Sequence, residues 1–196
     1  MNLCIIVSLL VLVIFILYYY FSCNNLVKVK SIHDYRYYNV RDFKNKQQSA
    51  DLLAQVRESM IKLVNHLKYK YPNNHQIIRL MQRFNPDVIN ESMFDKNNTS
   101  YTVNKGEHIA FCIRPNKNNY ELMPLNHMIF IAIHELAHVM SDYTPIGGDD
   151  HDTSFWNNMK FLLRNAIDIK IYTYYPYHLK PVNYCDIEIN NTPYKI

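Results

Sequence analysis

Glycine is scarce in this sequence, with three residues among 196. Tight turns that need a positive φ are therefore few, which argues against a loop-rich β-sandwich. No C-x-x-C pair occurs, so the chain has neither a cysteine-based structural zinc cluster nor a redox dithiol. Positive charge is in small excess, with 21 Lys and Arg against 17 Asp and Glu, and no stretch concentrates it. We therefore expect no nucleic-acid site.

An uncharged apolar run of 19 residues extends from Leu3 to Phe21. At about 1.5 Å per residue, a helix of this length just spans a hydrocarbon core of about 30 Å. A cleaved signal peptide is the alternative, but the run lacks a charged n-region and no A-x-A-like site follows it. We expect a retained transmembrane anchor over residues 3–21, a linker or ordered arm over residues 22–46, and one domain over residues 47–196.

Basic residues follow the apolar run, whereas the short segment before it carries only the amino terminus. The positive-inside rule then predicts a single-pass membrane protein, attached to a viral or host membrane through its N-terminal helix, with its domain on the cytosolic side. In that reducing setting we expect Cys112 and Cys185 to be two buried thiols. A Cys112–Cys185 disulfide is the alternative for an oxidising compartment.

The segment His134-Glu135-Leu136-Ala137-His138 is an H-E-x-x-H motif inside an apolar run. On a helix, residues i and i+4 lie on one face, so both imidazoles can reach one metal ion. Zinc held by three imidazoles keeps one position for water and lowers the pKa of that water to about 7. Glu135 would then accept the proton as general base. The alternative is a helix with hydrogen-bonded core histidines.

A third ligand is expected thirteen residues after His138, where His151 follows a loop with breakers at Pro145, Gly147 and Gly148. His151 directly precedes the start of a predicted helix, which Asp152, Thr153 or Ser154 would cap. It is therefore well placed to close a zinc site. The alternative oxygen ligands are Asp149, Asp150 and Asp152.

The motif helix, the loop and the following H-D-x-x-F-W, which spans His151 to Trp156, resemble the WLM and SprT-like zinc metallopeptidases. The resemblance covers about residues 75–190. Within this group, the chain resembles most the uncharacterised WLM-like proteins of large DNA viruses. The resemblance implies a zincin-like fold, Zn²⁺ bound by His134, His138 and His151, and a protein or peptide substrate. We find no C-terminal zinc finger pattern in this sequence, so we do not expect the family's role against DNA–protein crosslinks to carry over.

The chain reads as α+β, with a short antiparallel sheet or hairpin packed on the motif helix and flanking helices. A first helix should start near Ser49 or Asp51 and end before Pro72, and a second should end before Pro86. A hairpin is predicted from residues 101–103 and 109–113 around the turn at 104–107, followed by the motif helix and by a helix after His151. Residues 184–189 could form a last strand.

The strand at residues 108–113 is either an ordinary sheet strand or an exposed edge to which an extended substrate adds by β-augmentation. An oxyanion donor is also needed besides zinc. The sequence offers Tyr143, Tyr172, Tyr174, Tyr175, Tyr177 and His178. Asp142, Asp149 and Asp152 are candidates to accept the second ring N–H of the ligand histidines.

Three functions fit these patterns. The first is a membrane-anchored zinc metallopeptidase, an endopeptidase with Glu135 as general base. The second is a zinc-binding domain with weak or no turnover that acts as a tethered interaction module, and the third is a metal-free structural protein. Bound zinc would distinguish the third from the other two, and cleavage that depends on Glu135 would distinguish the first from the second. The oligomeric state does not follow from the sequence.

Overall fold

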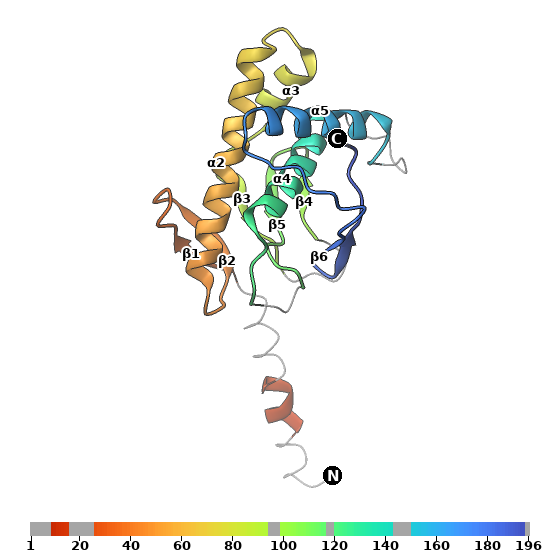
Figure 1. Cartoon of the computed structure of the whole chain (residues 1–196). Helices are drawn as coiled ribbons and strands as arrows, with labels where there is room; N and C mark the ends of the chain where they lie inside the picture. The colour runs from red at the N-terminus through yellow and green to blue at the C-terminus, as the bar shows by residue number, and fades with distance from the viewer. Residues whose placement is uncertain (1–8, 16–25, 94–98, 117–119, 143–149, 195–196) are drawn as a thin grey trace.

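The computed structural model describes residues 9–15, 26–93, 99–116, 120–142 and 150–194. The predicted α+β class is confirmed, since the described residues combine helices with three small β-sheets (Figure 1). The longer helices are α2 (Lys46–Lys70), α3 (His75–Arg83), α4 (Leu125–Met140) and α5 (Thr153–Asp168), and the 3₁₀ helix η1 spans Pro86–Val88. Helix α4 carries the H-E-x-x-H motif, as predicted.

Helix α2 ends before Pro72 as expected, but it begins several residues earlier than predicted. The two residues expected to cap it lie inside the helix and interact elsewhere. Asp51 Oδ1 accepts hydrogen bonds from Ser31 Oγ at 2.8 Å and from the Ile32 backbone N at 2.7 Å. Ser49 Oγ accepts from Arg114 at 3.1 Å. The two residues that the sequence suggested as helix caps therefore form tertiary hydrogen bonds instead.

The strands around α4 form a three-stranded sheet in the order β3-β5-β4. The predicted hairpin is confirmed, because β4 (Tyr101–Val103) pairs antiparallel with β5 (His108–Phe111), while β3 (Ile89–Glu91) pairs parallel with β5. Gly106 in the hairpin turn has a φ of 122°, and a Cβ there would lie 2.4 Å from the Arg83 carbonyl oxygen. The turn thus needs glycine both for its conformation and for its close approach to α3.

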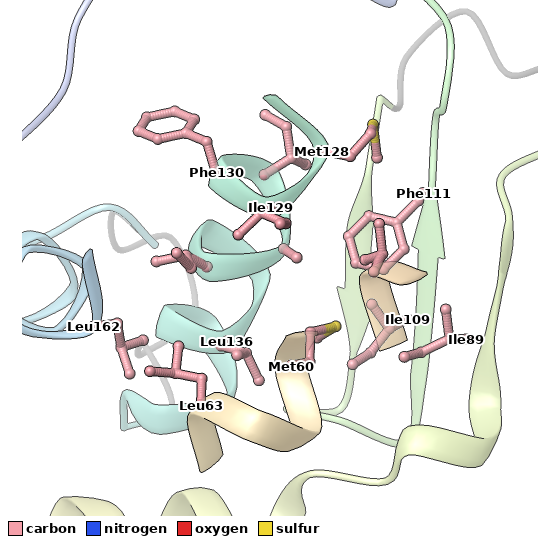
Figure 2. Packing of buried hydrophobic residues seen from close by; sticks show 14 of the residues in the cluster. Met60, Leu63, Ile89, Ile109, Phe111, Met128, Ile129, Phe130, Leu136 and Leu162 are labelled. Atoms are coloured by element: carbon pink, nitrogen blue, oxygen red, sulfur yellow. The ribbon is translucent and has the colours of Figure 1, made fainter. Parts of the chain in front are cut away.

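The core is centred on α4, which is apolar around most of its circumference. Figure 2 shows α4 between the sheet, represented by Ile109 and Phe111, and helix α5, represented by Leu162. Met60 and Leu63 of α2 pack near the same helix. Because α4 is surrounded on several sides, polar groups on it are held in fixed positions among fully buried side chains.

The stretch before α2 contains a β-hairpin. β1 (Leu26–Lys30) pairs antiparallel with β2 (Tyr37–Arg41), and the hairpin packs against α2. Residues 26–41 are therefore ordered within the region expected to be a linker or an ordered arm. The domain boundary at residue 47 stays a prediction.

A buried ion pair joins this hairpin to the rest of the molecule. Arg114 Nε lies 3.1 Å from Glu91 Oε1, and each side chain is 1% exposed. Glu91 Oε2 also accepts a hydrogen bond from the Arg41 backbone N at 2.8 Å. The guanidinium of Arg114 reaches Ser49 of α2 and packs over the Phe43 ring. One carboxylate and one guanidinium thus connect β2, β3 and the start of α2.

The expectation of two buried thiols is wrong, because Cys112 and Cys185 form a disulfide. Their Cα atoms lie 6.1 Å apart, a normal separation for a disulfide. The end of β5 lies against a C-terminal hairpin of β6 (Val182–Tyr184) and β7 (Ile187–Ile189), which replaces the single last strand expected there. The two cysteines are 73 residues apart, so only the tertiary structure reveals their proximity.

The predicted membrane anchor over residues 3–21 is also not supported, and with it the membrane attachment and the cytosolic topology are withdrawn. The described part of that stretch, residues 9–15, is a short helix. Among the described residues, no helix has the length and apolar character needed to cross a membrane. The remaining residues of the expected anchor lie outside the described part of the chain.

Candidate metal centre

Helix α4 places His134 and His138 on one face, one turn apart. Their Nε2 atoms lie 3.2 Å from each other. The helix starts directly after its N-cap residue, Pro124, and its buried apolar side chains set its rotation. The two imidazoles therefore project from a rigid element, as the i, i+4 spacing predicts.

His151 completes a group of three. It lies just before α5, whose N-cap is Asp152, with Oδ1 accepting from the Phe155 backbone N at 2.8 Å. The Nε2 atom of His151 lies 3.2 Å from that of His134. The three ligand atoms lie within 4.8 Å of one another and could hold a metal ion. Two nitrogens bound to one tetrahedral zinc at 2.0–2.1 Å would be about 3.3–3.4 Å apart, so the donor set fits zinc.

Phe155 forms an apolar wall behind the three imidazoles. Its ring centroid lies 4.9 Å from that of His134, 4.5 Å from that of His138 and 4.7 Å from that of His151. Burial lowers the pKa of His134 to about 3 and that of His138 to about 4, and the charge of the neighbouring imidazoles adds to both effects. Both rings are therefore neutral at pH 7, which is the form that binds a metal ion.

Glu135 lies on α4 beside this group and is 2% exposed. Burial raises the pKa of its carboxyl to about 7, while a hydrogen bond from Thr102 acts in the opposite direction. Thr102 Oγ1 donates to Glu135 Oε2 at 2.7 Å. A carboxyl with a pKa near neutrality can both accept and return a proton at physiological pH, as a general base must.

A cavity of about 540 Å³ opens over the three histidines and Glu135. Its opposite side consists of β4 and the turn after it, including Tyr101, Thr102, Asn104 and Lys105. β4 is the edge of the described sheet beside this cavity, while β5 lies in the middle of the sheet. The hypothesis of β-augmentation on residues 108–113 is therefore wrong, because β5 already has a neighbour on each side. The available edge near the histidines is β4.

Residues 30–183 match the WLM domain family. The chain belongs to the WLM family. The family is associated with metallopeptidase-like enzymes, which agrees with three histidines arranged to hold a metal ion. This WLM chain is also 29% identical, over 166 residues, to an uncharacterised protein of Acanthamoeba polyphaga mimivirus; the match covers 83% of this chain and 81% of that protein. The likeness supports a viral origin. No solved structure matches the chain.

The other predicted ligands of this WLM chain are placed differently from His151. Asp152 caps α5, Asp150 lines the cavity, and Asp149 lies outside the described residues. Asp142, proposed to accept a ring N–H from a histidine, instead forms an ion pair with Arg79 at 2.8 Å. These acidic residues cluster in the sequence, but of those that the structure describes, only Asp150 lines the cavity of the three histidines.

Among the described residues, the oxyanion donors suggested by the sequence do not line the cavity of this WLM chain. Tyr177 is buried and its hydroxyl lies 2.9 Å from His127 Nδ1, near the start of α4. Tyr143 lies outside the described residues, and among the rest none lines the cavity over the histidines: Tyr172, Tyr174, Tyr175, Tyr177 and His178. Sequence analysis missed Tyr101, Thr102 and Lys105, although their position on the hairpin directly before the motif helix was a usable signal.

Proposed function

We propose that this WLM protein is a zinc-dependent metallopeptidase that cleaves peptide bonds in protein or peptide substrates. The observation that carries the proposal is the juxtaposition of three imidazole nitrogens, spaced as zinc ligands, with the buried carboxyl of Glu135. A structural histidine cluster has no need of a glutamate whose pKa burial raises to about 7. Metal binding together with proton transfer explains both features.

In this mechanism His134, His138 and His151 hold the zinc ion. Zinc, when bound, would polarise the substrate carbonyl and acidify the attacking water. Glu135 accepts the proton of that water on its carboxylate and later donates it to the departing amine. Thr102 keeps the carboxylate oriented through its hydrogen bond. Phe155 helps to bury His134 and His138, and burial lowers the pKa of both rings and so favours their neutral form.

The substrate backbone would lie along β4. Among the described residues the outer side of β4 has no neighbouring strand, and an extended peptide can bind there by adding as a further strand. This alignment would carry the peptide past Glu135, because Thr102 of the same strand contacts that carboxylate. The proposal thus places substrate binding on β4 instead of β5.

The test is zinc content and metal-dependent cleavage in the purified full chain. We expect one zinc per chain and cleavage of an unfolded protein substrate that chelator abolishes and zinc restores. Loss of a residue that only supports a metal ligand weakens metal binding by about 10–100-fold. His151→Ala removes a ligand itself, so it should weaken zinc binding by more than about 100-fold. Asp150→Ala is the matched control and should retain zinc. Stoichiometric zinc without cleavage of any substrate would favour an interaction module, and absence of bound zinc would refute the proposal.

Loss of the Thr102 hydroxyl should shift the pH dependence of activity. The hydrogen bond from Thr102 lowers the pKa of Glu135, so Thr102→Val should raise that pKa and move the acid limb of the kcat/KM profile to higher pH. Thr102→Ser keeps the donor and should leave the limb near its wild-type position. Equal profiles for the valine and serine variants would show that the hydroxyl does not act on Glu135.

A further inference from the structure

A second cavity, of about 250 Å³, adjoins the metal centre. It shares Thr99, Ser100, His134 and Glu135 with the cavity over the histidines, so a group bound in one is next to the other. Its volume lies below the roughly 300–1,000 Å³ typical of pockets for drug-sized ligands. The space suits one side chain of a longer ligand.

The walls of this second cavity are mainly apolar. Phe130 and Ile131 of α4 and Met159 of α5 form its inner side, and all three are buried. Trp156 and Ile187 line it as well, although they are 43% and 51% exposed. Exposed large apolar side chains around one hollow are typical of a surface that binds an apolar group.

The outer wall comes from the C-terminal hairpin, which is anchored at the turn between β6 and β7. The Cys112–Cys185 disulfide joins it to the end of β5, and the Cys185 backbone N donates to the Arg114 carbonyl oxygen at 3.0 Å. The hydroxyl of Tyr184 is hydrogen-bonded to Ser100 Oγ. The hollow is therefore formed before any ligand arrives, and binding does not have to order the hairpin.

Besides Glu135, a second carboxyl group lines the cavity. Glu188 is on the hairpin between Ile187 and Ile189, and Asn190 donates to its Oε1 at 3.5 Å. A carboxylate from a ligand would be desolvated beside this like charge, which is unfavourable. The cavity should therefore reject acidic side chains more strongly than small neutral ones.

We propose that this cavity is a substrate subsite that accepts a large apolar side chain, such as leucine, phenylalanine or methionine, next to the cleaved bond. The inference rests on the proposed peptidase function, since its ligand is the residue that flanks the bond at Glu135. The C-terminal hairpin supplies the specificity through Ile187 and Ile189, with Trp156 opposite on α5. Asp and Glu are excluded by Glu188.

The test compares zinc-loaded full-length protein on short blocked alanine peptides that carry one leucine, aspartate or lysine at successive positions. At one position leucine should raise kcat/KM over alanine by about 10–200-fold, the range for added apolar volume in a pocket, and aspartate should lower it. Ile187→Ser should reduce the leucine-to-alanine ratio by about 10-fold. Leu179→Ser, at an exposed apolar residue that does not line the cavity, should leave the ratio unchanged.

Trp156 provides a readout that needs no cleavage, because it is the sole tryptophan of the chain and lines the cavity. Leucine peptides should shift its emission to shorter wavelength, and alanine peptides should not. A shift without cleavage would overturn the peptidase function and keep the subsite. Cleavage with no preference for an apolar residue and no shift would overturn the subsite alone. A preference for lysine that disappears in Glu188→Gln would also overturn it.

Discussion

Replacing Glu135 by glutamine is expected to lower kcat/KM by about 10²–10⁴-fold while the protein still binds zinc. Glutamine keeps the size of the side chain and can still accept the hydrogen bond from Thr102. It cannot accept the proton of the attacking water, because an amide is not basic. The three imidazoles proposed to hold the metal ion are unchanged, so this variant should lose activity but keep its zinc.

The measurement is kcat/KM on a peptide that the wild type cleaves, together with zinc per chain. Glu107→Gln is the matched control, since Glu107 is exposed at the neighbouring hairpin turn and does not line the cavity. Its activity should equal that of the wild type. If Glu135→Gln cleaved at the wild-type rate with zinc bound, Glu135 would not be the general base.

Removal of the buried carboxylate at position 91 is expected to destabilise the fold by about 3–5 kcal/mol. In Glu91→Ala the guanidinium of Arg114, 1% exposed, would lose its ion pair and keep only neutral partners such as Ser49 Oγ and the Tyr120 carbonyl oxygen. The Arg41 backbone N would lose its acceptor as well. The penalty comes mainly from the uncompensated buried charge, which water cannot reach.

Urea unfolding of the wild type and the variant measures this difference. Glu58→Ala is the control, because Glu58 pairs with His33 and Lys62 at a site where its side chain is 46% exposed. Such a surface pair should contribute no more than about 1 kcal/mol. Equal losses for the two variants would show that the Glu91–Arg114 pair has no special role in joining β2, β3 and α2.

The sequence predicted the motif helix well because the pattern is local. An apolar run with histidines at i and i+4 allows one geometry, and the structure has both Nε2 atoms 3.2 Å apart. The signal for the hairpin before the helix was also local, because the turn residues Asn104 to Glu107 connect two strands that are neighbours in the sequence. His151 was predicted from its position before a helix cap and lies beside His134. Its role as a ligand stays a prediction until zinc is measured.

Other features depended on contacts between distant segments. Ser49 and Asp51 resembled helix caps, but their partners lie elsewhere in the fold. The strand at residues 108–113 was a candidate edge until β3, far earlier in the chain, proved to pair with it. The apolar run at the N-terminus matched a membrane span in length, but its described part is only a short helix, and no helix among the described residues is long and apolar enough to cross a membrane.

The sequence by itself determined the chemistry available on α4, because the 3.6-residue period places His134, Glu135 and His138 without reference to the rest of the chain. Only the tertiary structure decided what surrounds that chemistry. It brought the Thr102 hydroxyl within hydrogen-bonding distance of Glu135 and the Phe155 ring against the imidazoles. It also brought the C-terminal hairpin to the end of β5, where the Cys112–Cys185 disulfide holds it. The physical reason is that these contacts arise from burial of a common core, which depends on all segments at once and leaves no local periodic signal.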